Sequence, residues 1–477
     1  MEAKKQKQMS SNGLTSYYLW RRLLNAGQSL TTIKVVFGNN RMKLARVLCV
    51  LLTAGWRGTP ALSGELPVTF SPHELGFAAD RLERLTQVFQ DYVDTGQLPG
   101  AVVLISRDDK VAYFRAIGYQ DRENKIAMAT DSIFRIASLT KPIIAVAAMI
   151  LVEEGRLDLA APVSQYLPEF KDVPVGVESL DPATSKAELR LEPQKRPMMV
   201  LDLLRHTAGL VHGQLGDSLV QKAYRAAKIP DRNRSLADMI TSLSKQPLAH
   251  QPGEVWEYSV AYDVLGRIIE VVSEMELGAF IEQRITKPLG MNSTEFYIRE
   301  ADVRRLAEPQ ANPDTGARPA WPDFTKKPRF YSGGGGLVST VHDYLRFSEM
   351  LMHKGVAGGV RLLAPSTVTL MTANALPPGI GYSERARTTM AADLAPTPTA
   401  GQGFGLGFAV RTAVGRNPLP GSVGTFYWTG AWGPTFWIDP WEKLIGILMI
   451  QVPSSSAGKF RRAMRNLTYQ ALTGNSE

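Results

Sequence analysis

The sequence predicts an α+β fold in which one sheet is built from strands at both ends of the chain. Strand-like apolar runs occur at residues 101–119 and return between residues 404 and 452. The stretch between them is dominated by helical periodicity, mainly over residues 200–355. With 477 residues, of which 44% are hydrophobic, the chain can bury two or three domain-sized cores. We therefore expect a helical subdomain inserted into a sheet domain, with a pocket at the seam.

The expected boundaries follow from these changes in pattern. Residues 65–170 together with 400–477 form the α/β sheet domain, and residues 171–399 form the inserted, mostly helical domain. Residues 1–64 precede both as a basic leader. The chain contains no internal sequence repeat.

The sheet domain begins with a helix and a hairpin. Residues 78–95 predict a helix that ends at Gly96, because apolar side chains recur at helical spacing. These side chains are Leu82, Leu85, Val88, Phe89 and Tyr92. Residues 101–119 then predict two strands around a polar turn at 107–110.

A second helix opens at Ser138 and ends at Gly155, and it is apolar on every side after its first turn. Residues 156–200 are rich in Pro, Asp and Glu and predict loops, and residues 372–402 predict a long excursion. Strands return in the segments FGLGFAV, TFYWTG, TFWIDP and LIGILMIQV. A helix near residues 457–472 ends the chain.

The leader has the layout of a signal peptide from Met42 onward. Two basic residues precede an apolar run at 47–54, which is too short to span a membrane, and small residues follow at 61–63. We expect Met42 to be the true start, or residues 1–41 to be an upstream extension, of a periplasmic or secreted bacterial protein. A basic tail on a cytoplasmic protein is the alternative. The only cysteine, Cys49, lies in this leader, so the mature chain would have no thiol nucleophile.

The distribution of charge and the spacing of the histidines argue against nucleic-acid binding and metal binding. Residues 1–60 contain ten lysines and arginines and one acidic residue, which accounts for the whole net charge of +9. The rest of the chain is neutral, so we expect no nucleic-acid partner. The six histidines show no tight ligand spacing, and we expect no metal and no cofactor. We also expect no stable membrane span.

Three Ser-x-x-Lys pairs are candidates for nucleophilic chemistry: Ser138/Lys141, Ser242/Lys245 and Ser456/Lys459. The pattern alone is common enough to arise by chance, so its context must decide. The second pair lies in a polar run and the third opens an amphipathic helix, where a serine cap and a solvated lysine are ordinary. Only the first pair begins a helix that is apolar all round.

The pair Ser138/Lys141 suits an activated serine. Residues i and i+3 share a helix face, so the amine can reach the hydroxyl and take or relay its proton. The N-terminus of a helix favours negative charge at the reacting centre. A serine cap followed by a snorkelling lysine is the structural alternative.

Other hydrolase signatures are weaker. The sequence has no Gly-x-Ser-x-Gly elbow. The letters GDSL occur at 216–219, but they lie in mid-chain and no histidine follows His353. A Ser-His-Asp triad is therefore disfavoured.

Several blocks in order resemble the serine β-lactamase-like family, which includes class C β-lactamases, D-alanyl-D-alanine carboxypeptidases and family VIII carboxylesterases. The resemblance covers about residues 75–472 and is greatest to the family VIII carboxylesterases. It implies a β-lactamase/transpeptidase-like fold with an antiparallel sheet flanked by helices. The blocks are SLTKP, LLRHTAGL, PGEVWEYSVAYDVLG, PLGMNST, GGGGLVSTVHDYLRF, GFGLGF and YWTGAWGPTFWIDP.

The resemblance implies a catalytic set of three residues. Ser138 matches the acylated nucleophile, Lys141 its partner, and Tyr258 the tyrosine of the family's second motif. The backbone N–H groups of Ser138 and Ala431 match the oxyanion hole. By the same comparison we interpret Asp263 as structural, pairing within its own helix.

Two further family blocks contain His206 and the glycine run 333–336. We interpret the histidine as a buried hydrogen-bonding residue. The glycines we interpret as a close backbone approach beside the pocket.

Two departures from the family pattern bear on the substrate. The usual Tyr-x-Asn is here Tyr258-Ser259-Val260, and the usual Lys-Thr-Gly is Trp428-Thr429-Gly430. The missing lysine would hold a substrate carboxylate, and its loss costs anionic substrates on the order of 1–3 kcal/mol. A tryptophan offers an apolar wall instead, which neutral esters tolerate.

The sequence therefore predicts a carboxylesterase that cleaves, and can transfer, the acyl groups of short-chain esters through an acyl-enzyme. A β-lactamase or D-alanyl-D-alanine carboxypeptidase is the main alternative, and a non-catalytic binding relative is the third. The expected partner is a small-molecule ester. Neither the natural ester nor the oligomeric state can be predicted from the sequence.

Overall fold

A computed structural model describes residues 70–180, 186–312, 315–319, 321–388 and 396–474. The chain divides into two compact units, and all described residues belong to the second, residues 58–477. The predicted leader at 1–64, with its expected start at Met42, lies outside the described residues.

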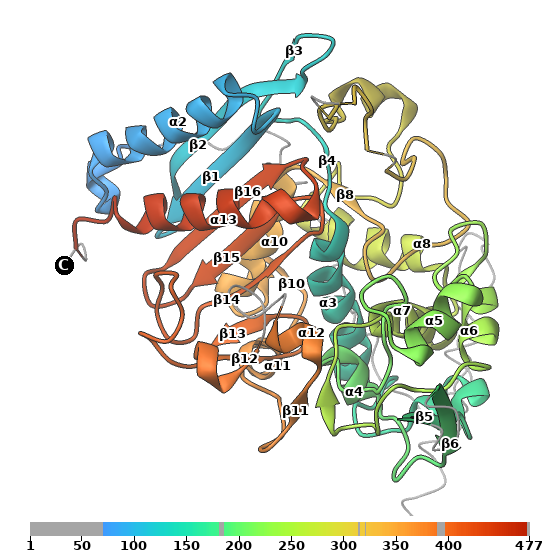
Figure 1. The fold of residues 1–477 in the computed structure, drawn as a ribbon. Helices are drawn as coiled ribbons and strands as arrows, with labels where there is room; N and C mark the ends of the chain where they lie inside the picture. The colour runs from blue at the N-terminus through green and yellow to red at the C-terminus, as the bar shows by residue number, and fades with distance from the viewer. Residues whose placement is uncertain (1–69, 181–185, 313–314, 320, 389–395, 475–477) are drawn as a thin grey trace, which may run out of the picture. The chain divides into compact units, whose positions relative to one another are not determined.

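One antiparallel sheet is built from both ends of the chain, as the sequence predicts (Figure 1). Its junction is the pairing of β1 with β16, in which Val103 lies opposite Leu448. Every residue of these two strands is buried, because helices cover both faces of the sheet. In spatial order the strands are β12 (Gln402–Phe404), β13 (Ala409–Arg411), β14 (Phe426–Thr429), β15 (Thr435–Asp439), β16 (Leu444–Ile450), β1 (Gly100–Arg107), β2 (Lys110–Asp121) and β3 (Ile126–Ala127).

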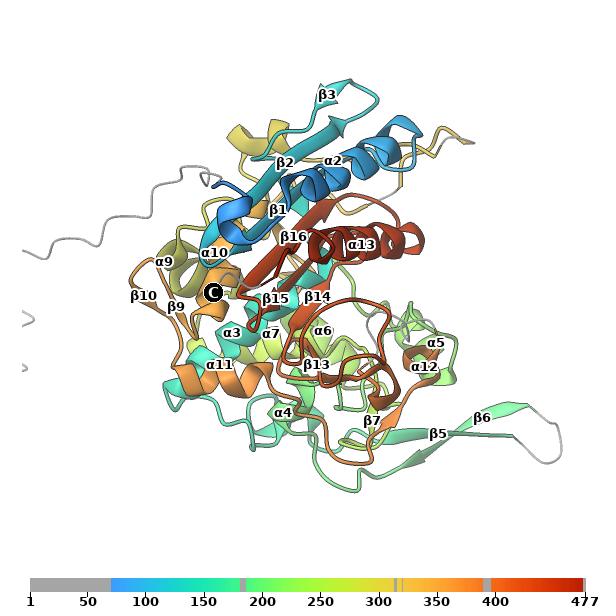
Figure 2. The ribbon, with the colours of Figure 1, turned by 90° about the vertical axis from the view of Figure 1, so that its left-hand side faces the viewer.

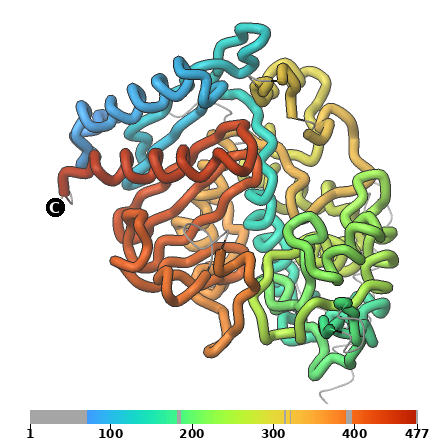
Figure 3. The backbone as a smooth tube through the Cα atoms, viewed as in Figure 1, coloured from blue at the N-terminus to red at the C-terminus, as the bar shows by residue number. Residues whose placement is uncertain are grey.

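Two terminal helices cover one face of the sheet. The first is α2 (Ala79–Asp94), which contacts β2, and the second is α13 (Ser454–Tyr469), which contacts β16. The two helices also contact each other, and Figure 3 shows these first and last parts of the chain running side by side. The helix predicted at 78–95 is thus confirmed, and it buries Leu82, Leu85, Phe89 and Val93.

Helices from the middle of the chain cover the other face. Helix α10 (Val341–Met352) contacts β16 and β1 and lies across the sheet from α13 (Figure 2). Helix α3 (Thr140–Glu153) is buried along its first twelve residues and contacts α7 and α8. Its burial on all sides explains why the sequence shows no polar face there.

The remaining helices belong mostly to the segment between the two halves of the sheet. A π-helical segment, Glu282–Thr286, joins α8 to α9. These helices are α4 (Val200–Leu204), α5 (Leu219–Ala226), α6 (Leu236–Leu243), α7 (Ala261–Ser273), α8 (Leu277–Ile281), α9 (Lys287–Leu289), α11 (Pro365–Thr372) and α12 (Glu384–Arg387). The predicted boundary at 171–399 stays a prediction, and α10 falls within it although it packs on the sheet.

Four short strand pairs lie outside the main sheet. The loop predicted at 156–200 contains one of them, a hairpin that extends away from the helices in Figure 2. Its second strand has the sequence Ala-Glu-Leu-Arg-Leu-Glu, an alternation of apolar and charged residues that is typical of a strand, so the loop prediction, which rested on the Pro, Asp and Glu content, is wrong for this segment. The pairs are β4 (Phe134–Arg135) with β8 (Val338–Ser339), β5 (Val175–Leu180) with β6 (Ala187–Glu192), β7 (Val255–Trp256) with β11 (Gly381–Tyr382), and β9 (Val356–Ala357) with β10 (Val360–Arg361).

Within the described part of the chain, no helix combines the length and apolar character needed to cross a bilayer.

Candidate active site

Ser138 lies on a single 3-10 turn, η2 (Ala137–Leu139), directly before α3. The turn is fixed from both sides: Tyr344 Oη donates to the Leu139 carbonyl at 3.0 Å, and Leu337 N donates to Thr140 Oγ1 at 3.1 Å. The residue before the serine, Ala137, has φ 46°, a conformation that is costly for a residue with a side chain. The surrounding contacts therefore hold Ser138 in a defined, strained position at the start of a buried helix.

Two of the predicted side chains, those of Lys141 and Tyr258, contact the hydroxyl oxygen of the third, Ser138. Lys141 Nζ lies 3.2 Å from Ser138 Oγ, and Tyr258 Oη donates to the same oxygen at 2.7 Å. Tyr258 arrives from 120 residues further along the chain. The structure thus brings together the hydroxyl, the amine and the phenol that the sequence analysis selected, although it shows no reaction.

Lys141 is enclosed by backbone and rings. It is 4% exposed, and its Nζ also donates to the Gly334 carbonyl. Its Nζ lies 4.7 Å from the ring centre of Tyr258 and 5.9 Å from that of Tyr262. Among the described residues no carboxylate forms an ion pair with it, so its proton is not held by a salt bridge.

Asp263 fixes the glycine loop that contacts this lysine. It is fully buried on α7 and accepts hydrogen bonds from Ser332 Oγ at 2.7 Å and from Gly334 N at 3.0 Å. Burial raises the pKa of the Asp263 carboxyl, and these two hydrogen bonds and the positive charge of Lys141 oppose the rise. Asp263 has structural contacts, as expected, but the expected pairing within its own helix is wrong, because both donors lie in the loop.

The glycine run at 333–336 makes the close backbone approach expected of it. A Cβ atom on Gly333 would lie 2.2 Å from the Tyr262 carbonyl oxygen. No residue with a side chain fits there without moving the loop. The approach places the Gly334 carbonyl beside Lys141, a partner that local sequence does not reveal.

His206 is buried behind the phenol. Its ring centre lies 4.8 Å from that of Tyr258, and its Nδ1 lies 3.4 Å from Ser259 Oγ. Burial, assisted by the charge of Lys141, lowers the pKa of His206 well below its usual value. The imidazole is therefore neutral and acts as packing behind Tyr258, in agreement with its expected structural role.

The turn between β14 and β15 places Ala431 near the nucleophile. Gly430 packs so tightly on η2 that a Cβ atom there would lie 2.3 Å from the Ile136 carbonyl oxygen. Among the described residues, the backbone N–H groups of Ser138 and Ala431 have no hydrogen-bond acceptor. Two free N–H groups beside a nucleophile are what an oxyanion hole requires.

Helix α13 anchors this turn, which sequence reasoning missed. Ser454 Oγ donates to the Ala431 carbonyl at 2.8 Å, and Arg461 Nε donates to the Gly433 carbonyl at 3.1 Å. Both contacts join the last helix to the hairpin, so only the folded chain reveals them.

Trp428 packs beneath the catalytic tyrosine candidate. It is 1% exposed, and its ring system lies against Tyr258 and Phe404, with ring centroids 5.7 and 5.3 Å apart. Thr429 is 8% exposed, and Gly430 is buried. The assignment of Trp428, Thr429 and Gly430 to a substrate pocket stays a prediction.

The rival motifs have structural roles. Ser218 of the GDSL segment caps α5 by accepting from Gln221 N at 3.1 Å. Ser242 Oγ donates to the Asp238 carbonyl at 3.0 Å, and Ser456 Oγ to the Pro453 carbonyl at 3.0 Å. Neither serine has a lysine contact like that of Ser138.

The described residues include no cluster of three acidic, histidine or cysteine side chains that could hold a metal.

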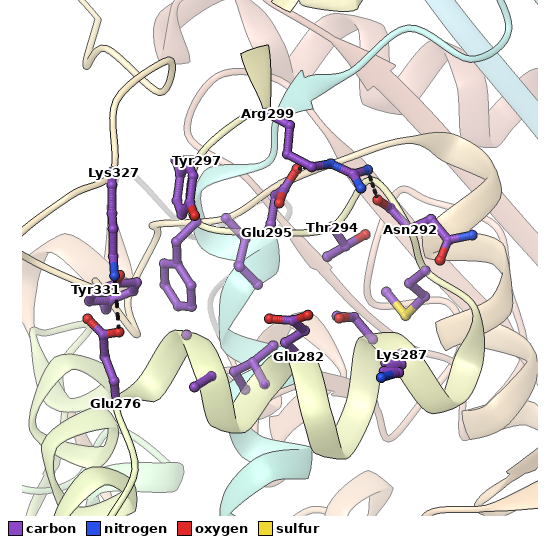
Figure 4. A pocket seen from close by; sticks show the side chains of 17 residues that line it. Glu276, Glu282, Lys287, Asn292, Thr294, Glu295, Tyr297, Arg299, Lys327 and Tyr331 are labelled. Atoms are coloured by element: carbon purple, nitrogen blue, oxygen red, sulfur yellow. Dashed lines mark hydrogen bonds and ion pairs between the residues drawn. The ribbon is translucent and has the colours of Figure 1, made fainter. Parts of the chain in front are cut away.

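A cavity of about 580 Å³ beside α8 is a second place where polar side chains gather (Figure 4). Glu282 points into it from the helix, and the other charged groups largely neutralise each other. Arg299 pairs with Glu295 at 3.4 Å, and Lys327 pairs with Glu276 at 3.6 Å. The cavity wall contains no activated nucleophile, so the serine site remains the stronger catalytic candidate.

Comparisons with known proteins show to which family the sequence and the fold are similar. A family model described as Beta-lactamase matches residues 85–470. Protein Rv1367c of Mycobacterium tuberculosis is 37% identical over 76% of this chain and 88% of its own length. Esterase EstB of Burkholderia gladioli is 29% identical over 84% of this chain and 98% of its own length. The structure of EstCE1, described as a hydrolase with promiscuous acyltransferase activity, is 28% identical with a TM-score of 0.67, covering 82% of this chain and 99% of its own.

Proposed function

Because the chain belongs to the beta-lactamase family of serine hydrolases, we propose that it is a carboxylesterase acting on short-chain acyl esters. The observation that carries this proposal is the meeting of Lys141 Nζ and Tyr258 Oη at Ser138 Oγ, at 3.2 and 2.7 Å. The unpaired N–H groups of Ser138 and Ala431 supply the second requirement of acyl transfer.

The proposed reaction has two acyl-transfer steps. Ser138 Oγ attacks the ester carbonyl carbon while its proton passes to the Tyr258–Lys141 pair. The carbonyl oxygen becomes negative and receives hydrogen bonds from the two backbone N–H groups. The C–O bond to the alcohol then breaks, and the alcohol leaves with the proton from the pair. Water adds to the acyl-enzyme by the same route in reverse, releasing the acid and restoring Ser138.

Lys141 Nζ and Tyr258 Oη both donate a hydrogen bond to Ser138 Oγ in this structure. One of the two groups must therefore lose its proton before the pair can act as a base. The chain offers two arrangements, a phenolate beside an ammonium or a phenol beside a neutral amine. Lys141 and Tyr258 touch each other as well as the nucleophile, so they act as one coupled pair.

The neutral, aromatic surroundings favour an ester over an anionic substrate. Tyr258 packs on Trp428, which stands where the lactam-processing relatives carry a lysine. A substrate carboxylate would lack that cation, whereas a neutral acyl ester requires none. An alcohol that replaces water in the second step would receive the acyl group, and EstCE1 is described as having promiscuous acyltransferase activity.

The test is a comparison of hydrolysis rates for p-nitrophenyl butyrate and a chromogenic cephalosporin. We expect the ester to be turned over faster, and we expect Ser138→Ala to abolish its turnover. Ser242→Ala is the matched control, since it alters a second Ser-x-x-Lys pair that lacks the lysine contact. Faster turnover of the cephalosporin would favour a β-lactamase or peptidase, and an active Ser138→Ala variant would exclude this site altogether.

The leader supports export to the periplasm or the medium as part of the same proposal. N-terminal sequencing of the protein from a bacterial host tests it. A mature chain beginning after residue 60 is the expected result, and an intact Met1 would contradict it.

A further inference from the structure

A cavity of about 920 Å³ lies apart from the nucleophile. Its wall is formed by β5, by the loop and helix at 211–221, by residues 249–251 and by the start of α12, together with Glu257. Ser138, Lys141 and Tyr258 do not line it. The proposed ester chemistry therefore leaves this cavity without a role.

Glu257 is a carboxylate with one unpartnered oxygen in the cavity wall. The residue is 5% exposed, and its buried Oε1 receives no hydrogen bond from any described residue. Its Oε2 lies 3.7 Å from His250 Nε2, a contact that is an ion pair only when the imidazole is protonated and that is longer than a hydrogen bond. A buried carboxylate oxygen without a donor is destabilising, and a ligand that brings a positively charged donor removes that penalty.

The charged side chains around the cavity determine which sign of charge the ligand should carry. Four acidic side chains line the wall, those of Glu178, Asp217, Glu257 and Glu384, against two basic side chains, those of Arg385 and His250. Lys222 and Arg225, which do not line the cavity, form ion pairs with Asp217 at 3.1 and 2.6 Å and neutralise its charge. Arg385 donates to the Leu215 carbonyl at 3.4 Å and makes no ion pair within the described chain. The wall thus keeps an excess of negative charge that favours a cation.

Another part of the wall is apolar and selects the body of the ligand. Val175, Val177, Val211, Leu215 and Val220 all line the cavity. A bare metal ion would leave this surface unused, and the described residues include no cluster of three metal-binding side chains. A molecule with an apolar body and one ammonium group uses both parts of the wall.

We propose that this cavity is a binding site for a small organic amine, whose ammonium group donates to the Glu257 carboxylate while its hydrocarbon part packs on the valine-rich wall. The site is independent of acyl-enzyme formation at Ser138. It adjoins the reaction centre through the chain, since Glu257 immediately precedes Tyr258, and through the hydrogen bond that Glu257 N donates to the His206 carbonyl at 3.0 Å.

Isothermal titration calorimetry of the full chain at neutral pH tests the site with two probes of the same ring size, benzylamine and benzyl alcohol. We expect benzylamine to bind at least about tenfold more tightly, since only its cation forms a charge-assisted hydrogen bond. Glu257→Gln should weaken benzylamine binding at least about tenfold and leave benzyl alcohol unaffected. The matched control is Glu349→Gln, which removes a partly buried carboxylate from α10 and should retain the wild-type affinity.

Two further results separate this site from the nucleophile. Ser138→Ala should bind benzylamine as tightly as the wild type, whatever the outcome of the ester assay. The thermal unfolding midpoint of Glu257→Gln should equal or exceed that of the wild type, because the substitution removes an unmatched buried charge. Equal affinity of the wild-type chain for both probes, or loss of benzylamine binding in Ser138→Ala, would overturn the proposal even if Glu257→Gln did not fold.

Discussion

The substitution Gly430→Ala tests whether the β14–β15 turn supplies the oxyanion hole. The added Cβ would lie 2.3 Å from the Ile136 carbonyl oxygen, which is backbone and cannot swing aside. Carbon and oxygen atoms need more than 3 Å, so the turn and η2 must separate by roughly 1 Å, a displacement that can cost about 100-fold in rate. Because Ala431 is the next residue, its N–H moves away from the Ser138 oxyanion site.

We therefore expect kcat for p-nitrophenyl butyrate to fall about 100-fold in Gly430→Ala, with KM changed much less, since an oxyanion donor acts mainly in the transition state. Overpacking should also lower the free energy of unfolding by about 1–3 kcal/mol. The control is Gly335→Ala on the other side of Ala137, where the new Cβ would lie 3.5 Å from its nearest neighbour. Wild-type kcat in a folded Gly430→Ala protein would refute the assignment of Ala431.

Two other predictions concern buried carboxylates. Asp263→Asn should lower kcat for the ester about tenfold and shift its pH profile, because the Gly334 loop that contacts Lys141 loses a charged acceptor; an unchanged pH profile would reduce Asp263 to a packing role. Burial raises the pKa of Glu349 from 4.5 to about 7, so the free energy of unfolding should fall as pH rises from about 4.5 to 7. Glu349→Gln should remove that fall and stabilise the protein by about 1–3 kcal/mol at pH 8.5 but not at pH 4, which urea unfolding at the two pH values measures; equal effects at both would contradict the reasoning.

Features that depend on residues close together in the sequence could be predicted from sequence patterns. The pair Ser138/Lys141 stands three residues apart on a helix that is buried on all sides, so both its spacing and its surroundings are visible in the sequence. The resemblance then added Tyr258, whose phenol the structure places 2.7 Å from the serine. Helix α2 was predicted because one set of apolar side chains repeats at helical spacing, and the β1–β2 hairpin because two apolar runs flank a polar turn.

Features that depend on contacts between distant segments could not be predicted. Asp263 meets Gly334 across 71 residues, and Ser454 meets Ala431 through the packing of α13 on the sheet. The sequence also does not reveal that Glu257 Oε1 lacks a hydrogen-bond donor, because this depends on which groups all the neighbouring segments place around it. The β5–β6 hairpin was missed for another reason: the Pro, Asp and Glu content of residues 156–200 is typical of loops, although β6 alternates apolar and charged residues.

The pairing of β1 with β16 has a consequence for biosynthesis. During translation β1 emerges early, while the strand that occupies its second edge is made more than three hundred residues later. Until then that edge presents open backbone groups to any passing strand. The loop bearing Ala431 and the helix that anchors it also follow Ser138 by about three hundred residues. A nascent chain therefore contains its serine long before the loop and the helix that complete the candidate site have been made.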